Sequence, residues 1–240
     1  MTAFAAMLCF AVAVLPLRPA GAQALADLAR ASRVTGDGLF GSIELEAGSL
    51  QGLPQWTRVL ERMEADREAF DRCAADPAYC PTPILKNWRR IITSAANLNR
   101  PEQLKAVNDF FNRWPYKQDR ELYGLSEYWA TPREFMTRSG DCEDYSIAKY
   151  FALRKLGFRT DEMRIVILMD RIRGIGHAVL AIYVENDILI LDSLSSLILS
   201  HARYKHYIPQ YSMNESTRWA HIGGQRKRAT PPYRGLLARQ

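Results

Sequence analysis

Cysteine and histidine are scarce in this 240-residue chain, which contains four of each. Beyond residues 3–17 it also lacks a long apolar run, which excludes a protein embedded in a membrane along its length. The formal net charge is +6, but basic and aromatic residues are not interleaved, so the sequence gives no support for nucleic-acid binding. Much of that charge comes from the segment after Glu215, which has no acidic residue. We expect residues 216–240 to form a basic, flexible tail and residues 23–215 to form one globular domain.

The N-terminal apolar run has the length of a signal-peptide core and is short for a membrane span. Ala20-Gly21-Ala22 fits a cleavage site, so the sequence predicts a signal peptide at residues 1–22 and a mature chain that begins at Gln23. The residues before the apolar core include no lysine or arginine, and Arg18 follows the core. An uncleaved membrane anchor is therefore the alternative.

Cysteine spacing agrees with export. Once Cys9 is removed with the signal peptide, Cys73 and Cys80 are separated by six residues that include the turn signal Asp76-Pro77. A Cys73–Cys80 disulfide would close this short loop in an oxidising compartment. Cys142 is then left without a partner, either buried or kept for its reactivity.

Cys142 lies between acidic residues, directly after Gly140-Asp141 and before an apolar helical pattern. The pattern predicts that Cys142 stands at a helix N-terminus, where the helix dipole favours a thiolate. Asp141, Glu143 and Asp144 oppose this, because nearby carboxylates raise the pKa of a thiol. A bound cation would neutralise them, and calcium tolerates irregular clusters of oxygen ligands. The alternative is an acidic helix cap around a buried cysteine.

Periodicity predicts an α+β fold in which helices precede a sheet. The predicted helices span residues 55–73, 84–92, from 101 onward and 142–157, and the predicted strands span residues 163–169, 177–184 and 188–192. The aromatic-rich segment 112–138 is too irregular for one helix. We interpret it as a loop packed over the core, with the wall of a substrate groove as the alternative.

Of the four histidines, His201, His206 and His221 fall in a polar C-terminal part that we expect to be exposed. His177 begins a strand, and Asp192 ends the next one. A two-residue turn between the strands would put both side chains on one face of the sheet, whereas a three-residue turn would put them on opposite faces. Cys142, His177 and Asp192 then form a possible nucleophile, base and orienting acid.

These segments resemble the bacterial transglutaminase-like cysteine peptidases, and within them the LapG-type periplasmic proteases. The similarity lies in Tyr128 to Phe135, in Gly-Asp-Cys-Glu-Asp-Tyr at 140–145 with Ile147 to Tyr150, in His177 to Leu180 and in Leu191 to Leu194. Ser193 departs from the asparagine that is common in the family.

The resemblance implies a papain-like and transglutaminase-like fold, with the nucleophile helix packed on an antiparallel sheet. It implies Cys142 as nucleophile, His177 as general base and acid, and Asp192 as the residue that orients His177. It also implies that Asp141, Glu143 and Asp144 bind calcium.

For the LapG-type proteases, the resemblance further implies a periplasmic enzyme that cuts a large surface adhesin at an alanine-alanine site near its N-terminus and so releases biofilm cells. An inner-membrane receptor for cyclic-di-GMP sequesters such proteases. We expect this chain to act as a monomer. Two alternatives keep the same fold: a transglutaminase that passes the acyl group to an amine, and a calcium-dependent binding protein without catalytic activity.

Overall fold

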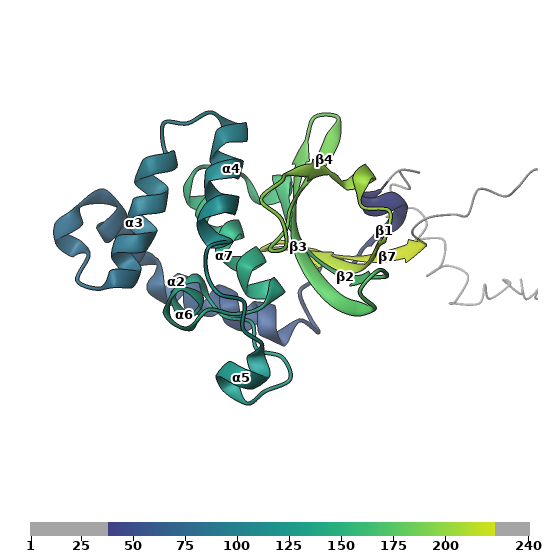
Figure 1. Ribbon diagram of the computed structural model, residues 1–240, viewed down its shortest axis with the longest axis horizontal. Coiled ribbons are helices and arrows are strands. Elements are labelled where there is room, and N and C mark those ends of the chain that lie inside the picture. The colour runs from purple at the N-terminus through teal and green to yellow at the C-terminus, as the bar shows by residue number, and fades with distance from the viewer. Residues whose placement is uncertain (1–37, 224–240) are drawn as a thin grey trace, which may run out of the picture. The chain divides into compact units, whose positions relative to one another are not determined.

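The computed structural model describes residues 38–223, so the predicted signal peptide and the end of the predicted tail lie outside the described residues. Within this range helices and a sheet form two layers (Figure 1). The helices are α2 (Pro54–Ala75), α3 (Pro83–Ala95), α4 (Arg100–Phe111), α5 (Asp119–Tyr123), α6 (Pro132–Arg138) and α7 (Cys142–Lys155). The four predicted helices are confirmed as α2, α3, α4 and α7. None of the helices in the described part of the chain has the length and hydrophobicity that a membrane span requires.

Short local signals fix where these helices begin. The helices α2, α3, α4 and α6 each have a proline in the first turn, where its missing N–H costs no hydrogen bond. Side chains of Thr82, Asn99 and Thr131 accept hydrogen bonds from the first-turn amides of α3, α4 and α6. The starts of α2, α3 and α4 therefore follow from local sequence signals, whereas α6 lies in the segment that we interpreted as a loop.

The sheet of the described range has seven antiparallel strands in the order β1-β7-β6-β2-β3-β4-β5. They are β1 (Ser42–Glu46), β2 (Met163–Asp170), β3 (Ile175–Val184), β4 (Asp187–Leu191), β5 (Leu199–Ser200), β6 (Tyr207–Met213) and β7 (Arg218–Gly223). The three predicted strands are confirmed as β2, β3 and β4. The prediction missed β5, β6 and β7, and β7 carries the sheet past residue 215, where we expected the domain to end.

The expectation of an exposed His221 was wrong. Its ring is buried on β7, with Nδ1 2.8 Å from Ser42 Oγ and Nε2 2.9 Å from Ser212 Oγ. These contacts join β7 to β1 and to β6, so His221 ties the two ends of the domain together. The polar local sequence concealed this, because the strand that covers it comes from the far end of the chain.

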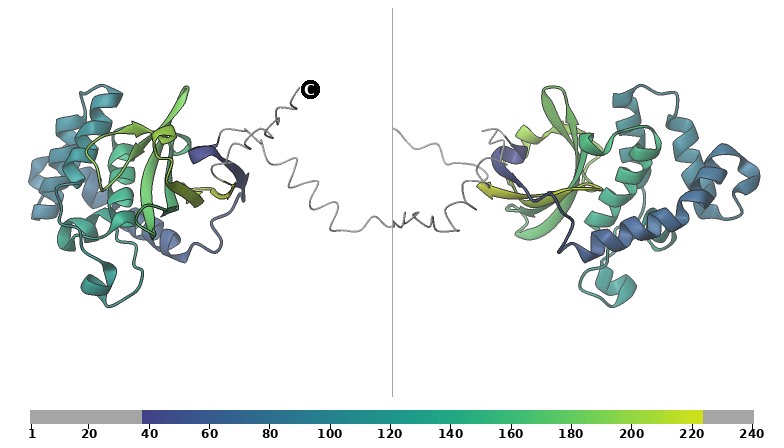
Figure 2. Two further views of the ribbon diagram at one scale, coloured as in Figure 1. Left: turned by 45° about the vertical axis from the view of Figure 1, so that its right-hand side comes forward. Right: turned by 180° about the vertical axis from the view of Figure 1, so that it is seen from behind.

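The two faces of the sheet pack against different partners. In β2 and β3, Ile165 and Leu180 join the core under the helices, whereas Val166 and Val179 join a second core on the opposite face. This alternation follows from the two-residue period of a strand. The helix α7 lies on the first face and makes its main sheet contacts with β3, and the other helices pack outside it (Figures 1 and 2). The fold therefore places α7 against β3.

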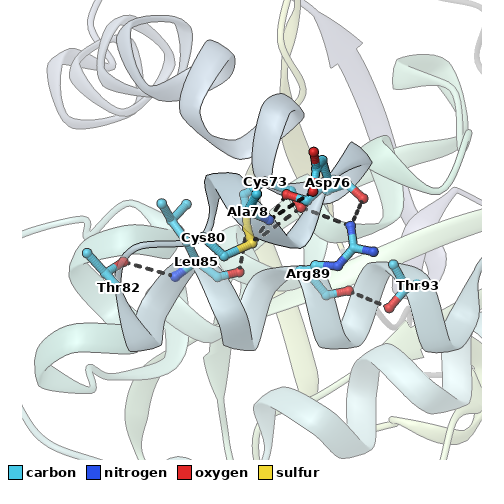
Figure 3. The surroundings of a disulfide bond; sticks show 9 residues. Cys73, Asp76, Ala78, Cys80, Thr82, Leu85, Arg89 and Thr93 are labelled. Carbon is cyan, nitrogen blue, oxygen red and sulfur yellow. Dashed lines mark hydrogen bonds between the residues drawn. A yellow bond between two sulfur atoms is a disulfide. The ribbon is translucent and has the colours of Figure 1, made fainter.

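The predicted disulfide between Cys73 and Cys80 is confirmed. It closes the loop after α2, with the two Cα atoms 4.9 Å apart. Arg89 on α3 donates to the carbonyls of Cys73 and Ala74, at 3.0 Å for Cys73, and so satisfies the last turn of α2 (Figure 3). The bridge and this arginine together fix the α2–α3 connection.

Candidate active site

The helix α7 begins at Cys142, as predicted, and Asp144 closes its first turn. Asp144 Oδ2 accepts the backbone N–H of Asp141 at 3.1 Å, and Asp144 Oδ1 accepts the backbone N–H of Ala130 at 2.6 Å. A Cβ atom on Gly140 would lie 2.0 Å from Asp144 Oδ2, so only glycine fits at that position. Gly140 and Asp144 therefore fix the turn that places the Cys142 thiol at the start of α7.

Burial and negative charge surround the Cys142 thiol. Its sulfur lies 3.3 Å from Glu143 Oε2, and the backbone N–H of Ala178 on β3 donates to the sulfur. Burial, followed by the charges of Glu143 and Asp141, raises the pKa of the thiol well above its usual range, and the Ala178 amide offsets only part of this. The carboxylates thus act on the thiol as the sequence indicated, and a cation among them would favour the thiolate.

His177 and Asp192 lie in contact because the hairpin between β3 and β4 has the two-residue turn that this contact requires. Strand β3 pairs with β4 from Val184↔Asp187 to Leu180↔Leu191, which is the register of a two-residue turn. His177 Nε2 lies 2.9 Å from Asp192 Oδ1, and both side chains are buried. Because Nε2 faces the carboxylate, Nδ1 is the ring nitrogen left for the nucleophile.

Three donors hold the Asp192 carboxylate. Besides His177, the Tyr207 hydroxyl donates to Oδ2 at 2.6 Å and the Leu194 amide donates to Oδ1 at 3.0 Å. Burial by itself would raise the pKa of Asp192, but the hydrogen bond and charge of His177, helped by Tyr207 and Leu194, lower it below its usual range. Asp192 is thus an ionised, fixed partner for the imidazole.

The structure brings the thiol and the His177–Asp192 pair to the same stretch of β3. The sulfur contacts the amide of Ala178, which directly follows His177. The thiol contacts Glu143, Ala178 and the Tyr116 hydroxyl, and the imidazole contacts Asp192 and Tyr207. A helix N-terminal thiol next to an imidazole–carboxylate pair has the parts that nucleophilic acyl transfer needs.

The acidic residues form two overlapping groups. One consists of Asp141, Cys142 and Glu143, and the other of Asp119, Asp141 and Asp144; in each, one ligand atom per residue lies within 4.8 Å of the others. Asp119 Oδ1 and Asp141 Oδ1 are buried and have no hydrogen-bond partner in the described part of the chain. Unsatisfied buried carboxylate oxygens are what a hard cation binds, so these residues fit calcium.

The pKa values of Asp119, Glu143 and Asp144 reflect the same crowding of carboxylates. Burial, then the charge of Asp141, raises the pKa of Asp119 to about 6, and burial with the hydrogen bond and charge of Asp141 raises that of Glu143 to about 10. For Asp144, burial raises the pKa well above its usual range, against the opposing hydrogen bond from Ala130. Several carboxylates held this close are stable when a proton or a cation compensates them.

Sequence reasoning missed Asp119, which lies in the aromatic-rich segment and reaches Asp141 only through the fold. It also missed Tyr116, half-exposed, whose ring stacks on Tyr145 with the ring centroids 6.2 Å apart. The Tyr116 hydroxyl is within hydrogen-bonding reach of the Cys142 sulfur. Trp129, by contrast, is buried in the core, which agrees with a segment packed over the core. The segment is not all loop, because it contains α5 and α6.

Sequence reasoning gave no role to two asparagines that bond the backbone next to Asp192. Asn112, at the end of α4, donates from Nδ2 to the carbonyls of Asp192 and Ser195, both at 2.9 Å. Asn108 donates to the same Ser195 carbonyl at 3.0 Å. These bonds hold the turn after β4 and so fix the backbone from which Asp192 projects.

Comparison with known proteins agrees with this geometry. The family model described as bacterial transglutaminase-like cysteine proteinase matches residues 70–227. Calcium-bound LapG of Legionella pneumophila is similar to this chain, with 32% identity, a TM-score of 0.56 and coverage of 68% of this chain and 91% of that one. The EGTA-treated form gives 30%, 0.56, 67% and 87%, and a further LapG structure gives 31%, 0.54, 64% and 86%. No curated protein sequence matches the chain.

Proposed function

The chain belongs to the bacterial transglutaminase-like cysteine proteinase family and is a cysteine peptidase of the LapG type, and we propose that it is a calcium-dependent endopeptidase of the periplasm. We further propose that it cleaves the N-terminal region of a large surface adhesin and thereby controls release from a biofilm. The observation that carries the catalytic assignment is the His177–Asp192 pair at 2.9 Å beside the strand residue that contacts the Cys142 sulfur.

In the proposed mechanism His177 Nδ1 takes the proton of the Cys142 thiol, and the thiolate attacks the carbonyl of the scissile peptide. The Nε2–H of His177 donates to Asp192, which holds the ring and stabilises the imidazolium. The backbone N–H of Cys142, at the start of α7, meets the developing oxyanion, and the Tyr116 hydroxyl is the second donor in this scheme. His177 then protonates the leaving amine, and water releases the acyl group from Cys142.

Asp141, Glu143 and Asp144, joined by Asp119, would hold the calcium ion. Bound there, the ion supplies positive charge that lowers the pKa of the thiol and compensates the crowded carboxylates. The LapG structures described as calcium-bound and EGTA-treated support this part of the proposal. So do the unpaired oxygens of Asp119 and Asp141.

The periplasmic location is supported by the Cys73–Cys80 disulfide, since such bridges persist in oxidising compartments. The predicted signal peptide at residues 1–22 belongs to the same proposal. A membrane receptor that senses cyclic-di-GMP is the proposed regulatory partner of a monomeric enzyme. Neighbouring genes for a large repeat adhesin, its secretion system and such a receptor would support this role.

The test is proteolysis of an adhesin N-terminal fragment by the wild-type protein, with calcium and with EGTA. We expect cleavage with calcium, its loss with EGTA, and its absence in Cys142→Ala, His177→Gln and Asp192→Asn. Asp161→Asn, which changes an exposed carboxylate away from the site, is the matched control and should cleave like the wild type.

Mass spectrometry of the products separates the competing functions. New peptide termini support hydrolysis, whereas isopeptide bonds would show transfer to an amine. Undiminished cleavage by Cys142→Ala would refute the assignment of the nucleophile. A Cys142 thiol with no heightened reactivity toward a thiol-directed probe in calcium would favour a binding protein without catalysis.

A further inference from the structure

The strand β3 is longer than the partner on one of its sides. It pairs with β2 from Ile175 to Ile182, but with β4 only from Leu180 to Val184. After Leu191 the chain turns away, because Asn112 and Asn108 hold the carbonyls of the following turn. Within residues 38–223, no strand pairs with residues 175–179 of β3 on that side.

The backbone groups at this open edge can be identified from the ladder. In antiparallel strands, alternate residues direct both N–H and C=O to the same neighbour. The N–H of Arg171 points toward β6 and donates to His206 O at 3.0 Å, so alternate residues of β2, including the partner of His177, face β3. Gly176 and Ala178 therefore face away from β2, which agrees with the hydrogen bond from Ala178 N–H to the Cys142 sulfur.

Gly176 leaves this edge accessible. Gly176 is exposed, and a Cβ atom placed on it would meet no atom within 4 Å. On the same hairpin, Ile175 is 52% exposed and Ile172 is 76% exposed, so apolar side chains flank the open backbone. An exposed strand edge with free N–H and C=O groups is a template for an extended chain.

We propose, on the basis of the proposed function, that the β3 edge at Gly176 is a substrate subsite where the substrate main chain adds to the sheet as an extended strand. Gly176 N–H and C=O bond one substrate residue, and Ala178, about 7 Å further along the strand, leads the substrate to the Cys142 sulfur. Affinity thus comes from main-chain hydrogen bonds, with apolar contacts from Ile175.

A substrate-side test needs no change to the enzyme. The probe is a fluorogenic octapeptide with a central alanine-alanine pair. It is compared with a set of peptides, each of which carries a single N-methyl group on a different amide outside that pair. Strand addition predicts that kcat/KM falls about fivefold or more where a bonded amide is methylated and changes less than about twofold at its immediate neighbours. A scan without one sensitive amide between two insensitive neighbours would overturn the proposal, and failure to cleave the unmodified peptide would overturn the proposed function with it.

An enzyme-side test compares two variants at one position. Gly176→Pro removes the N–H, and proline is tolerated on a strand edge, while Gly176→Ala keeps the N–H. We expect kcat/KM of Gly176→Pro to be about fivefold or more below that of Gly176→Ala, with the difference in KM. Both should react with iodoacetamide at Cys142 at the same rate, since a small reagent does not use the edge. Equal kcat/KM for the two variants, with equal iodoacetamide rates, would refute the subsite.

Discussion

Lys149 offers the sharpest test of the electrostatics around this site. It lies on α7 with no exposed surface, and its Nζ has no hydrogen-bond partner within the described residues. The centroid of the Tyr145 ring lies 5.9 Å from Nζ. Burial lowers the pKa of Lys149 to about 7, although the charge of Asp192 acts in the opposite direction.

The magnitude follows from this shift. A fall in pKa from 10.5 to about 7 corresponds to about 5 kcal/mol of cost for the charged form in the fold. Below pH 7 the lysine is charged in both the folded and the unfolded protein, so the full cost is present. Between pH 7 and 10.5 the unfolded chain binds the extra proton, so the free energy of unfolding rises by up to about 1.4 kcal/mol per pH unit.

Lys149→Met keeps the volume and removes the charge. We expect it to increase the free energy of unfolding most at pH 6, and this advantage should shrink by roughly 2–3 kcal/mol between pH 7 and pH 9. Urea unfolding of both proteins in saturating calcium at pH 6, 7, 8 and 9 measures it. Both proteins contain the same acidic groups, so the contribution of these groups cancels in the difference between the two free energies of unfolding.

Lys155→Met is the control, because it removes a more exposed lysine from the last turn of the same helix. The difference in free energy of unfolding between Lys155→Met and the wild type should not show the decline between pH 7 and pH 9 that we expect for Lys149→Met. If the wild-type and Lys149→Met curves run parallel from pH 6 to pH 9, Lys149 does not lose its proton on folding, and the reasoning from burial is wrong.

Three further perturbations test the site and its frame. Asp119→Asn should weaken calcium binding by about tenfold or more in isothermal titration, and unchanged affinity would remove Asp119 from the ligand set. Replacing both Cys73 and Cys80 by alanine should lower the free energy of unfolding by about 2 kcal/mol in urea titrations under oxidising conditions. When the disulfide of the wild type is reduced, the two proteins should have the same free energy of unfolding. Asn112→Ala removes both donors to the turn after β4 and should cost about 1–2 kcal/mol of stability and lower kcat more than KM; a variant with full kcat would show that the turn holds itself.

Much of the fold could be predicted because its signals are local. Proline and capping residues mark the helix starts, and short spacing with a turn signal predicted the disulfide. The contact between His177 and Asp192 could be predicted only conditionally. A two-residue turn in the hairpin puts both side chains on the same face of the sheet, whereas a three-residue turn would separate them. The sequence could not decide between two and three residues in that turn.

The remainder depends on contacts between distant segments. Asp119 reaches the acidic cluster from a different segment of the chain, and Tyr207 reaches Asp192 from a strand whose pattern was too mixed to recognise. Nothing in the immediate neighbourhood of either residue distinguishes it from an ordinary surface aspartate or core tyrosine. The pairing of β1 with β7 likewise joins the two ends of the domain, so the local sequence of neither strand indicates its partner.

The close approach of Asp144 to Gly140 limits how this enzyme can vary. Even alanine at residue 140 would displace a carboxylate that is already committed to the amides of Asp141 and Ala130, and the helix start and the aromatic segment would shift together. In a saturation library selected for proteolysis, residue 140 should accept no substitution. A search for altered specificity should therefore leave this position untouched and diversify the exposed hairpin at residues 172–175 instead.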